Sequence, residues 1–416
     1  MAAPSLSHRE ARAPIAPDRN GVVYGLVVLS ACAVIASGGE YGGSRADPVV
    51  AHESTAAAVP ALARCGAALC AGERRFDWNG VTAFALADLV AEGRLADARA
   101  FVSWARATGF TILRVLAMLP SGGWMNLSPE DGRRALPAVF EMARAEGLYV
   151  QVVALANTNE RSGRFRTDAF LRAQVGETAR LCADAGNCVL EFANEPYHGS
   201  QAALDDPARM RMLALEVPGG LPVAWGATER DDSPRMSGGD FVVVHLARSG
   251  RWWDRVSRAS DLARLSLAVG KFVVDNEPIG AAERAEPNRR ESNPDAFLAQ
   301  GIAARLAAAG ATFHCEDCLL ARVPGPVQQR CATAFMEGRR LVPERQSMSM
   351  VPADGVATLP PGGQGRLLAA AAGERAWVLA LGPAARGLSW TAGWRGDRRL
   401  LARDELLVWT ARRSAP

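Results

Sequence analysis

The sequence predicts an α/β fold, namely a (β/α)8 barrel followed by a small β-sandwich. The first observation is a set of eight apolar, strand-like runs that alternate with helical patterns over roughly 265 residues, a usual barrel length. The second is that these runs are continuously apolar, which is typical of parallel strands buried on both faces. The third is a change after Leu341 to short strand-like runs broken by Gly and Pro.

Eight strands and five helices are predicted within the barrel. The strand runs are residues 76–84, 111–119, 148–156, 188–194, 221–227, 241–247, 271–277 and 311–317. The helical patterns are residues 95–109, 128–147, 168–186, 257–270 and 293–310. Gly109 is a suitable helix C-cap, and Ser128 followed by Pro129 is a typical helix start.

Two features of the sequence bear on whether the α/β fold is a barrel or an open sheet. The segment between the fifth and sixth strands is too short for a full helix, which departs from a regular barrel. An open doubly wound sheet is the alternative, but it usually has a Gly-rich phosphate turn after its first strand. Here the first strand leads into ALADLVAEG, which contains no such turn, so the barrel is favoured.

The N-terminal segment has the pattern of a targeting signal. Arg9, Arg12 and Arg19 precede the apolar run 21–37, which is short for a membrane span. Leu-Ser-Ala-Cys ending at Cys32 resembles a bacterial lipoprotein box, so lipid anchoring at Cys32 stands beside a cleaved signal or an uncleaved anchor. We therefore predict a secreted or cell-envelope protein.

The remaining boundaries follow from composition. Residues 38–64 are rich in Gly, Ala, Ser and Pro and are predicted to be a linker. The barrel is assigned to residues 65–340 and the small sandwich to residues 341–416. The formal net charge is +3 and the charges are spread without long blocks, so no nucleic-acid surface is predicted. We expect a monomer.

Eight cysteines are present, and six of them come in close pairs. The pairs are Cys65/Cys70, Cys182/Cys188 and Cys315/Cys318. In an exported protein this spacing favours local disulfides. The alternative is zinc held by His314, Cys315, Cys318 and Cys331, but only one C-x-x-C is present and no second pair completes a zinc ribbon. We predict no metal.

Asn-Glu-Pro occurs twice, each time directly after an apolar run. Glu195 ends the fourth predicted strand, and Glu277 ends the seventh. In a barrel the carboxyl ends of the strands share one rim, where catalytic groups lie. Two carboxylates across such a rim are what cleavage of a glycosidic bond requires, one protonated as the acid and one ionised as the nucleophile.

On these motifs the chain resembles clan A glycoside hydrolases, broadly the family 5 cellulase and mannanase group. The resemblance implies that Glu195 is the acid/base and Glu277 the nucleophile of a retaining mechanism, with the two carboxyl groups roughly 5–5.5 Å apart. It implies that Asn194 bonds the sugar 2-hydroxyl, that Arg114 supports the nucleophile, and that His245 lies beside substrate or nucleophile. It also implies an oligo- or polysaccharide substrate and no cofactor.

The resemblance covers residues 73–340 and has departures. Glu283 follows Glu277 closely, and only position at the end of the apolar run favours Glu277 as the nucleophile. The tryptophan often found at strand eight is absent, and His314 and Cys315 stand there. A non-catalytic carbohydrate-binding surface protein on a decayed barrel is therefore an alternative, and a zinc-dependent hydrolase is a weaker one.

Further residues are candidates for contact with sugar. The polar candidates are His198, Asn79, Asn157 and Asn159, and the aromatic candidates are Trp225, Trp124, Trp252 and Trp253. For His198 the alternative is a loop cap, and for each tryptophan it is core packing. Trp390 and Trp394 in the predicted sandwich could also bind sugar, but packing against the barrel is the favoured role of that domain.

Overall fold

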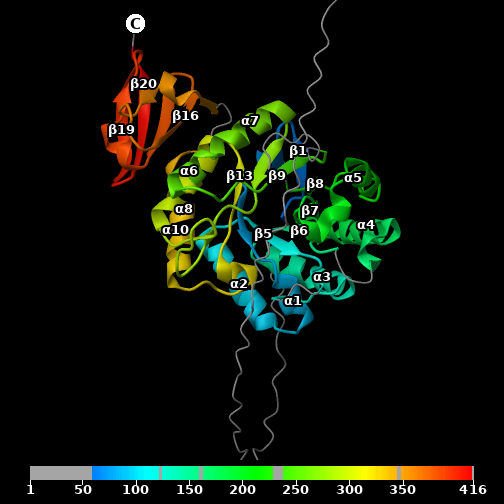
Figure 1. Ribbon diagram of the computed structural model, residues 1–416. Coiled ribbons are helices and arrows are strands. Elements are labelled where there is room, and N and C mark those ends of the chain that lie inside the picture. The colour runs from blue at the N-terminus through cyan, green and yellow to red at the C-terminus, as the bar shows by residue number, and fades with distance from the viewer. Residues whose placement is uncertain (1–58, 121–123, 159–162, 228–237, 344–347, 415–416) are drawn as a thin grey trace, which may run out of the picture. The chain divides into compact units, whose positions relative to one another are not determined.

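The computed structural model describes residues 59–120, 124–158, 163–227, 238–343 and 348–414. It confirms the predicted barrel, because all eight predicted strands lie in one parallel sheet with helices around it (Figure 1). Four predictions lie outside the described residues: the signal with Cys32, most of the linker, Asn159, and most of the short segment between the fifth and sixth strands.

The barrel strands are joined edge to edge in the order β8-β7-β6-β5-β4-β13-β10-β9. Their bounds are β4 Asn79–Thr82, β5 Ile112–Leu116, β6 Tyr149–Leu155, β7 Cys188–Ala193, β8 Val223–Gly226, β9 Phe241–Val244, β10 Phe272–Asp275 and β13 Gly310–Phe313. At the start of the two outermost strands, the amide of Asp240 donates to the carbonyl of Val223 at 2.6 Å. The sheet is therefore nearly closed.

Helices follow most of the strands. Their bounds are α1 Leu86–Ala91, α2 Leu95–Thr108, α3 Pro129–Ala145, α4 Asp168–Ala185, α5 Pro207–Ala214, α6 Trp252–Ser257, α7 Ala259–Val269, α8 Pro294–Leu306, α9 Glu316–Leu319 and α10 Pro326–Leu341. The predicted caps are present: Gly109 has φ 103°, and the Ser128 hydroxyl accepts from the Asp131 amide at 3.0 Å. The predicted helix 257–270 is confirmed as α7, and a separate short helix, α6, precedes it from Trp252.

A small antiparallel sheet closes the amino end of the barrel. Its strands are β1 Leu62–Cys65, β2 Ala68–Ala71 and β3 Arg74–Arg75. Leu62, Leu69 and Phe76 are buried in one hydrophobic cluster with inward-facing residues at the start of the barrel strands. The Tyr149 hydroxyl donates to the carbonyl of Pro60 at 2.7 Å. Residues 59–64, the described part of the predicted linker, thus belong to this end of the barrel.

The C-terminal part is an antiparallel sheet in the order β14-β16-β17-β20-β19, with a two-stranded ribbon of β15 and β18. The strands are β14 Ser349–Val351, β15 Ala357–Thr358, β16 Arg366–Ala372, β17 Arg375–Leu381, β18 Ser389–Trp390, β19 Trp394–Arg403 and β20 Leu406–Arg413. Trp377 and Leu379 share a hydrophobic cluster with Leu298 and Ile302 of α8. Trp390 and Trp394 are half-buried against the other face of the sheet, next to Val378, so both pack as parts of this domain.

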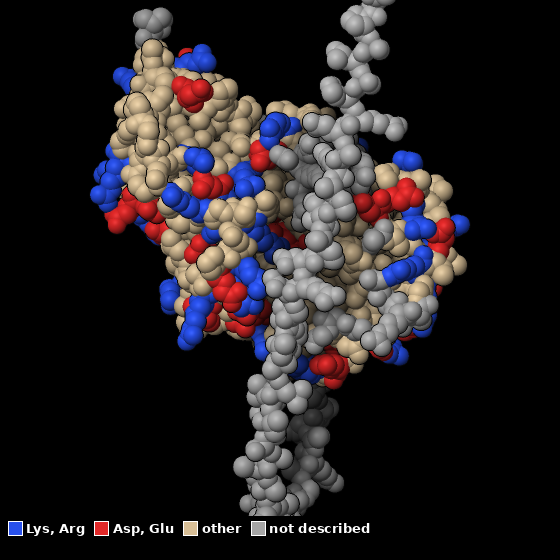
Figure 2. Space-filling view, in the orientation of Figure 1, with Lys and Arg blue, Asp and Glu red and all other residues tan. Residues whose placement is uncertain are grey.

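The three predicted cysteine pairs form disulfides in the structure: Cys65–Cys70, Cys182–Cys188 and Cys315–Cys318. The thiol of Cys331 is free and buried, and burial raises its pKa to about 12. Within the described ranges, no helix has both the length and the apolar character needed to cross a bilayer. On the face shown in Figure 2, basic and acidic side chains are interspersed.

Candidate active site

The two glutamates singled out in the sequence meet at the carboxyl end of the barrel. Glu195 follows β7 and Glu277 follows β10, two strands on opposite sides of the sheet order. One oxygen of each carboxylate and one ring nitrogen of His245 all lie within 4.8 Å of one another. The barrel therefore brings together side chains that are 82 residues apart in the chain.

Glu277 is held by two arginines, one on each carboxylate oxygen. Arg114 Nη1 donates to Oε1 at 2.7 Å, and Arg248 Nη2 donates to Oε2 at 3.0 Å. Arg248 Nε also donates to the backbone carbonyl of Glu277 at 3.1 Å. Burial by itself would raise the pKa of Glu277, but His245, Arg114 and the other nearby cationic groups lower it well below its ordinary value. Glu277 is therefore an ionised carboxylate.

Glu195 is less buried, with a side chain 25% exposed, and its contacts differ. Its Oε1 lies 3.0 Å from His245 Nδ1 and accepts a hydrogen bond from the Tyr197 hydroxyl at 3.0 Å. Burial raises the pKa of Glu195, whereas the hydrogen bond and the charge of His245 lower it, and the net direction is downward. The negative charge of Glu277 acts in the opposite sense and raises the pKa of Glu195.

Arg114 lies at the centre of a buried polar network below the two glutamates. Its Nε and Nη2 each donate to one oxygen of Glu191 at 3.0 Å, and Nη2 also donates to Asn194 Oδ1 at 2.7 Å. Gln151 Nε2 donates to Glu191 at 2.8 Å. The guanidinium therefore joins two carboxylates, Glu191 and Glu277, and fixes Asn194 beside them.

Glu191 was not identified from the sequence, although one signal was present. It is a charged residue inside the apolar run CVLEF, and its side chain is 0% exposed. Burial raises the pKa of Glu191, and Arg114 acts against that rise. A charge in a fully apolar strand needs a buried partner, so this position could have been paired with Arg114, the other charged residue in an apolar run. Arg248 lies in a loop and gave no comparable signal.

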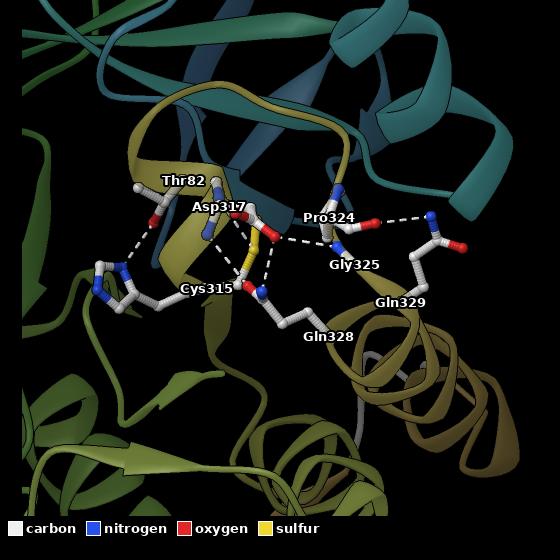
Figure 3. Close-up of a disulfide and its surroundings, with 9 residues drawn as sticks. Thr82, Cys315, Asp317, Pro324, Gly325, Gln328 and Gln329 are labelled. Carbon is white, nitrogen blue, oxygen red and sulfur yellow. Dashed lines mark hydrogen bonds between the residues drawn. A yellow bond between two sulfur atoms is a disulfide. The ribbon is translucent and has the colours of Figure 1, made fainter. Parts of the chain in front are cut away.

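His314 occupies the end of the eighth strand beside the site. Its Nδ1 lies 3.0 Å from the Thr82 hydroxyl, and its carbonyl accepts from the Ala281 amide at 2.8 Å. Burial is the main cause that lowers the pKa of His314 to about 4, so the ring is neutral at pH 7. The disulfide of Cys315 and Cys318 directly follows it (Figure 3).

Neither candidate metal group is suited to a cation as the residues stand. Glu195, His245 and Glu277 have donor atoms close enough to share an ion. However, both oxygens of Glu277 are bonded to guanidinium groups, whose positive charge would repel a cation. In the second group, the sulfurs of Cys315 and Cys318 are bonded to each other.

Three predicted binding residues do not join this group. Asn79 begins β4 and therefore lies at the opposite end of the barrel, where its Oδ1 accepts from Arg339 Nε at 2.7 Å. The side chain of Trp225 points away from the barrel interior and is buried in the surrounding hydrophobic cluster. Its neighbour Ala224 belongs to the interior cluster, and successive strand residues face opposite sides. His198 is exposed and its Nδ1 lies 2.8 Å from the Ser200 hydroxyl, so it caps a loop.

Of the other amide and aromatic candidates, three have structural contacts and one is exposed. Asn157 Nδ2 donates to the carbonyl of Pro120 at 3.3 Å, which ties two loops together. Trp252 and Trp253 pack in the hydrophobic cluster shared with the C-terminal sheet. Trp124 differs, because it is 46% exposed, and it stacks on Phe84 with ring centroids 6.5 Å apart.

Comparison with known proteins supports the fold. No family model matches the chain, and no curated protein matches it. A solved structure described as a glycoside hydrolase has a TM-score of 0.59 at 12% identity, covering 85% of this chain and 97% of that one. A family 5 glycoside hydrolase from Bacteroides vulgatus has a TM-score of 0.56 at 13% identity, covering 85% and 93%.

A third solved structure was determined with a bound oligosaccharide. It is a β-glucanase from Saccharophagus degradans in complex with cellotetraose, with a TM-score of 0.50 at 10% identity, covering 67% of this chain and 93% of that one. At identities this low the likeness concerns the fold. The chain thus has the eight-stranded barrel fold found in family 5 glycoside hydrolases.

Proposed function

We propose that this protein is an exported, retaining glycoside hydrolase that cleaves a β-linked glycan through a double displacement by two glutamates. The observation that carries the proposal is the convergence of Glu195 and Glu277, whose carboxylates approach within 4.8 Å. Retaining glycosidases have their two carboxyl groups about 5–5.5 Å apart, and inverting ones about 6.5–9.5 Å apart. An approach of one oxygen from each carboxylate to within 4.8 Å is compatible with the retaining arrangement, in which a carboxylate rather than an intervening water attacks.

In this proposal Glu277 is the nucleophile. Its lowered pKa keeps it ionised, and the two arginines hold its oxygens in fixed positions. Attack on the anomeric carbon forms a covalent glycosyl ester and breaks the bond to the leaving oxygen. Glu191 balances much of the charge of Arg114, so the guanidinium orients Glu277 without fully quenching it.

Glu195 is the acid/base. It protonates the leaving oxygen in the first step and deprotonates water in the second. In the free enzyme His245 brings the net pKa of Glu195 below its ordinary value, while the negative charge of Glu277 acts in the opposite sense and raises it. That contribution disappears once Glu277 is esterified, so the pKa of Glu195 falls at the step in which it must act as a base. His245 and Tyr197 orient its carboxylate.

Asn194 is assigned to the sugar 2-hydroxyl. Its Oδ1 is held by Arg114, so its amide group is fixed at the rim between the two glutamates. A hydrogen bond to the 2-hydroxyl strengthens in the transition state of such reactions. The substrate class, an oligo- or polysaccharide, is supported by the named sugar complex of a similar fold. Export is supported by the N-terminal basic and apolar segment.

The test is to replace Glu195 and Glu277 separately by Ala and to assay aryl β-glycosides and a glycan panel. Each change is expected to reduce kcat by at least about 10²–10⁴-fold, the usual contribution of a positioned acid/base group. Azide should restore turnover of Glu277→Ala with inverted product, because a small anion fills the space of the lost nucleophile. Glu283→Gln is the matched control, since Glu283 is the other candidate and bonds the Val327 amide instead. Wild-type turnover in both alanine variants would overturn the assignment.

The departure at strand eight favours one alternative, a non-catalytic carbohydrate-binding protein. His314 stands where a tryptophan often forms part of the sugar site, and it is buried and bonded to Thr82. Glycan binding by calorimetry, together with no product after days of incubation with wild-type protein, would establish this alternative.

A further inference from the structure

A cavity lies beside the proposed nucleophile, on the side of the eighth strand. The loop after Glu277 folds back on itself through β11 (Gly280–Ala281), which pairs with β12 (Arg290–Glu291). Between this loop, Arg248 and His314 lies a cavity of about 380 Å³. We call it the arginine cavity, because Arg248, Arg289 and Arg290 all line it. Apart from Arg248, which holds Glu277, none of its residues has a role in the proposed hydrolysis of a neutral sugar.

Not every charged side chain at the cavity has a paired counter-charge. Arg290 is matched, since its Nη1 lies 3.2 Å from Glu286 and 2.9 Å from Glu316. Arg289 is exposed, and in the described part of the chain its side chain has no ion pair or hydrogen bond. His314 is neutral at pH 7. Arg289 therefore lines the cavity with a guanidinium that has no direct partner among the described residues, although Glu316 lies in the same lining.

Arg248 contributes a second donor edge. Its Nε and Nη2 are used on Glu277, whereas Nη1 has no hydrogen-bond partner among the described residues. The guanidinium therefore holds the proposed nucleophile with one edge and leaves the other edge for a ligand. Guanidinium groups bind carboxylates and sulfates with paired, charge-assisted hydrogen bonds.

The cavity wall is kept open by a glycine. A Cβ at Gly280 would lie 2.8 Å from Cδ2 of His314, which is itself fixed by Thr82. A larger residue at this position would push His314 or fill the space beside it. The Gly280 position is thus compatible with a ligand-sized space between the loop and the eighth strand.

We propose that the arginine cavity binds an anionic group of the substrate, carried by the sugar whose anomeric carbon meets Glu277. The group is a carboxylate of a uronosyl unit or a sulfate ester, and Arg248 and Arg289 are its ligands. Arg248 bonds Glu277 and also lines the cavity, so the anion belongs to the sugar bound at the nucleophile rather than to a distant unit. This inference rests on the proposed function and narrows its substrate to an acidic glycan.

The test compares matched neutral and acidic ligands on two proteins. Binding is measured by calorimetry on the Glu195→Gln variant, so that the measurement does not depend on turnover. The ligands are a neutral β-linked oligosaccharide, its uronate counterpart and its sulfated counterpart. Wild-type kcat/KM is measured on aryl β-glucoside and aryl β-glucuronide. Each is repeated with Arg289→Gln added, and with Arg284→Gln as control, since Arg284 lies on the same loop but does not line the cavity.

We expect the acidic ligand to bind at least about tenfold tighter than the neutral one, the range of one charge-assisted hydrogen bond. Arg289→Gln should reduce this acid-to-neutral ratio about tenfold, Arg289→Lys should restore part of it, and Arg284→Gln should leave it as in wild type. Tighter binding of the uronate or of the sulfated ligand identifies the source of the anion. Equal binding of acidic and neutral ligands would overturn the inference, and hydrolysis of neutral glycosides by the two glutamates would still leave the proposed function intact.

Discussion

Replacing Glu191 by Gln tests whether the buried network below the site is a charge pair on which the fold depends. The side chains of Glu191 and Arg114 are 0% and 1% exposed, and they share two hydrogen bonds of 3.0 Å. Gln keeps the size of Glu191 but removes its charge and points an amide group at the arginine donors. Removing one partner of a buried ion pair costs about 3–5 kcal/mol.

The expected loss is therefore about 3–5 kcal/mol in the free energy of unfolding, measured by urea denaturation at pH 7. The control is Glu130→Gln, which breaks the exposed pair with Arg164 on the surface, whose side chains are 52% and 59% exposed. That change should cost about 0–1 kcal/mol. A loss below about 1 kcal/mol in Glu191→Gln would refute the view that Arg114 is held mainly by this carboxylate.

Three further changes test other parts of the structure. Burial raises the pKa of Asp275 to about 6, above the unfolded value near 4, so ionisation of Asp275 costs stability as pH rises from about 4 to 6. Relative to wild type, Asp275→Asn should therefore gain about 3 kcal/mol in the free energy of unfolding by pH 8. An equal difference between the two proteins at pH 4 and pH 8 in urea titrations would contradict this. Gly132→Ala places a Cβ 1.8 Å from the carbonyl of Ala117, so thermal unfolding should show a loss of about 1–3 kcal/mol or more, and an unchanged Tm would be the contrary result. Asn79→Ala should cost about 1–3 kcal/mol by removing the partner of Arg339, with kcat/KM as in wild type; a reduced kcat/KM in folded protein would return Asn79 to the site.

The strands and their order could be predicted because burial on both faces leaves a plain record in the sequence. Each barrel strand is an apolar run, and a parallel arrangement then puts the residue after each run on a common rim. That reasoning located Glu195 and Glu277 on one rim of the barrel. It needs no knowledge of side-chain direction, because the residue at a strand end is placed by the backbone alone.

The misplaced residues show what that reasoning lacks. Asn79 was taken as a strand-end residue, but β4 begins at Asn79, so it lies at the other end of the barrel. Trp225 lies near the correct end but faces outward, since a shift of one residue reverses the side of a strand. Strand ends from sequence are uncertain by a few residues, and both errors fall within that margin.

Other residues could not be found from one sequence. Arg248 acts from a loop, where neither periodicity nor burial fixes a position, and its contact with Glu277 depends on how the loop folds. His314 was noted only as a departure, and its bond to Thr82 links the neighbouring first and eighth strands. Such contacts arise from the tertiary structure and have no local pattern.

The small sheet at the amino end of the barrel has a consequence for how the protein meets a large glycan. Leu62, Leu69 and Phe76 fill that end, so a substrate has access to the two glutamates only from the opposite rim. The first described residue, Val59, packs against the hydrophobic cluster at this filled end. The connection to the upstream residues therefore leaves the barrel at the end opposite Glu195 and Glu277, so it does not occupy the rim where these two side chains meet.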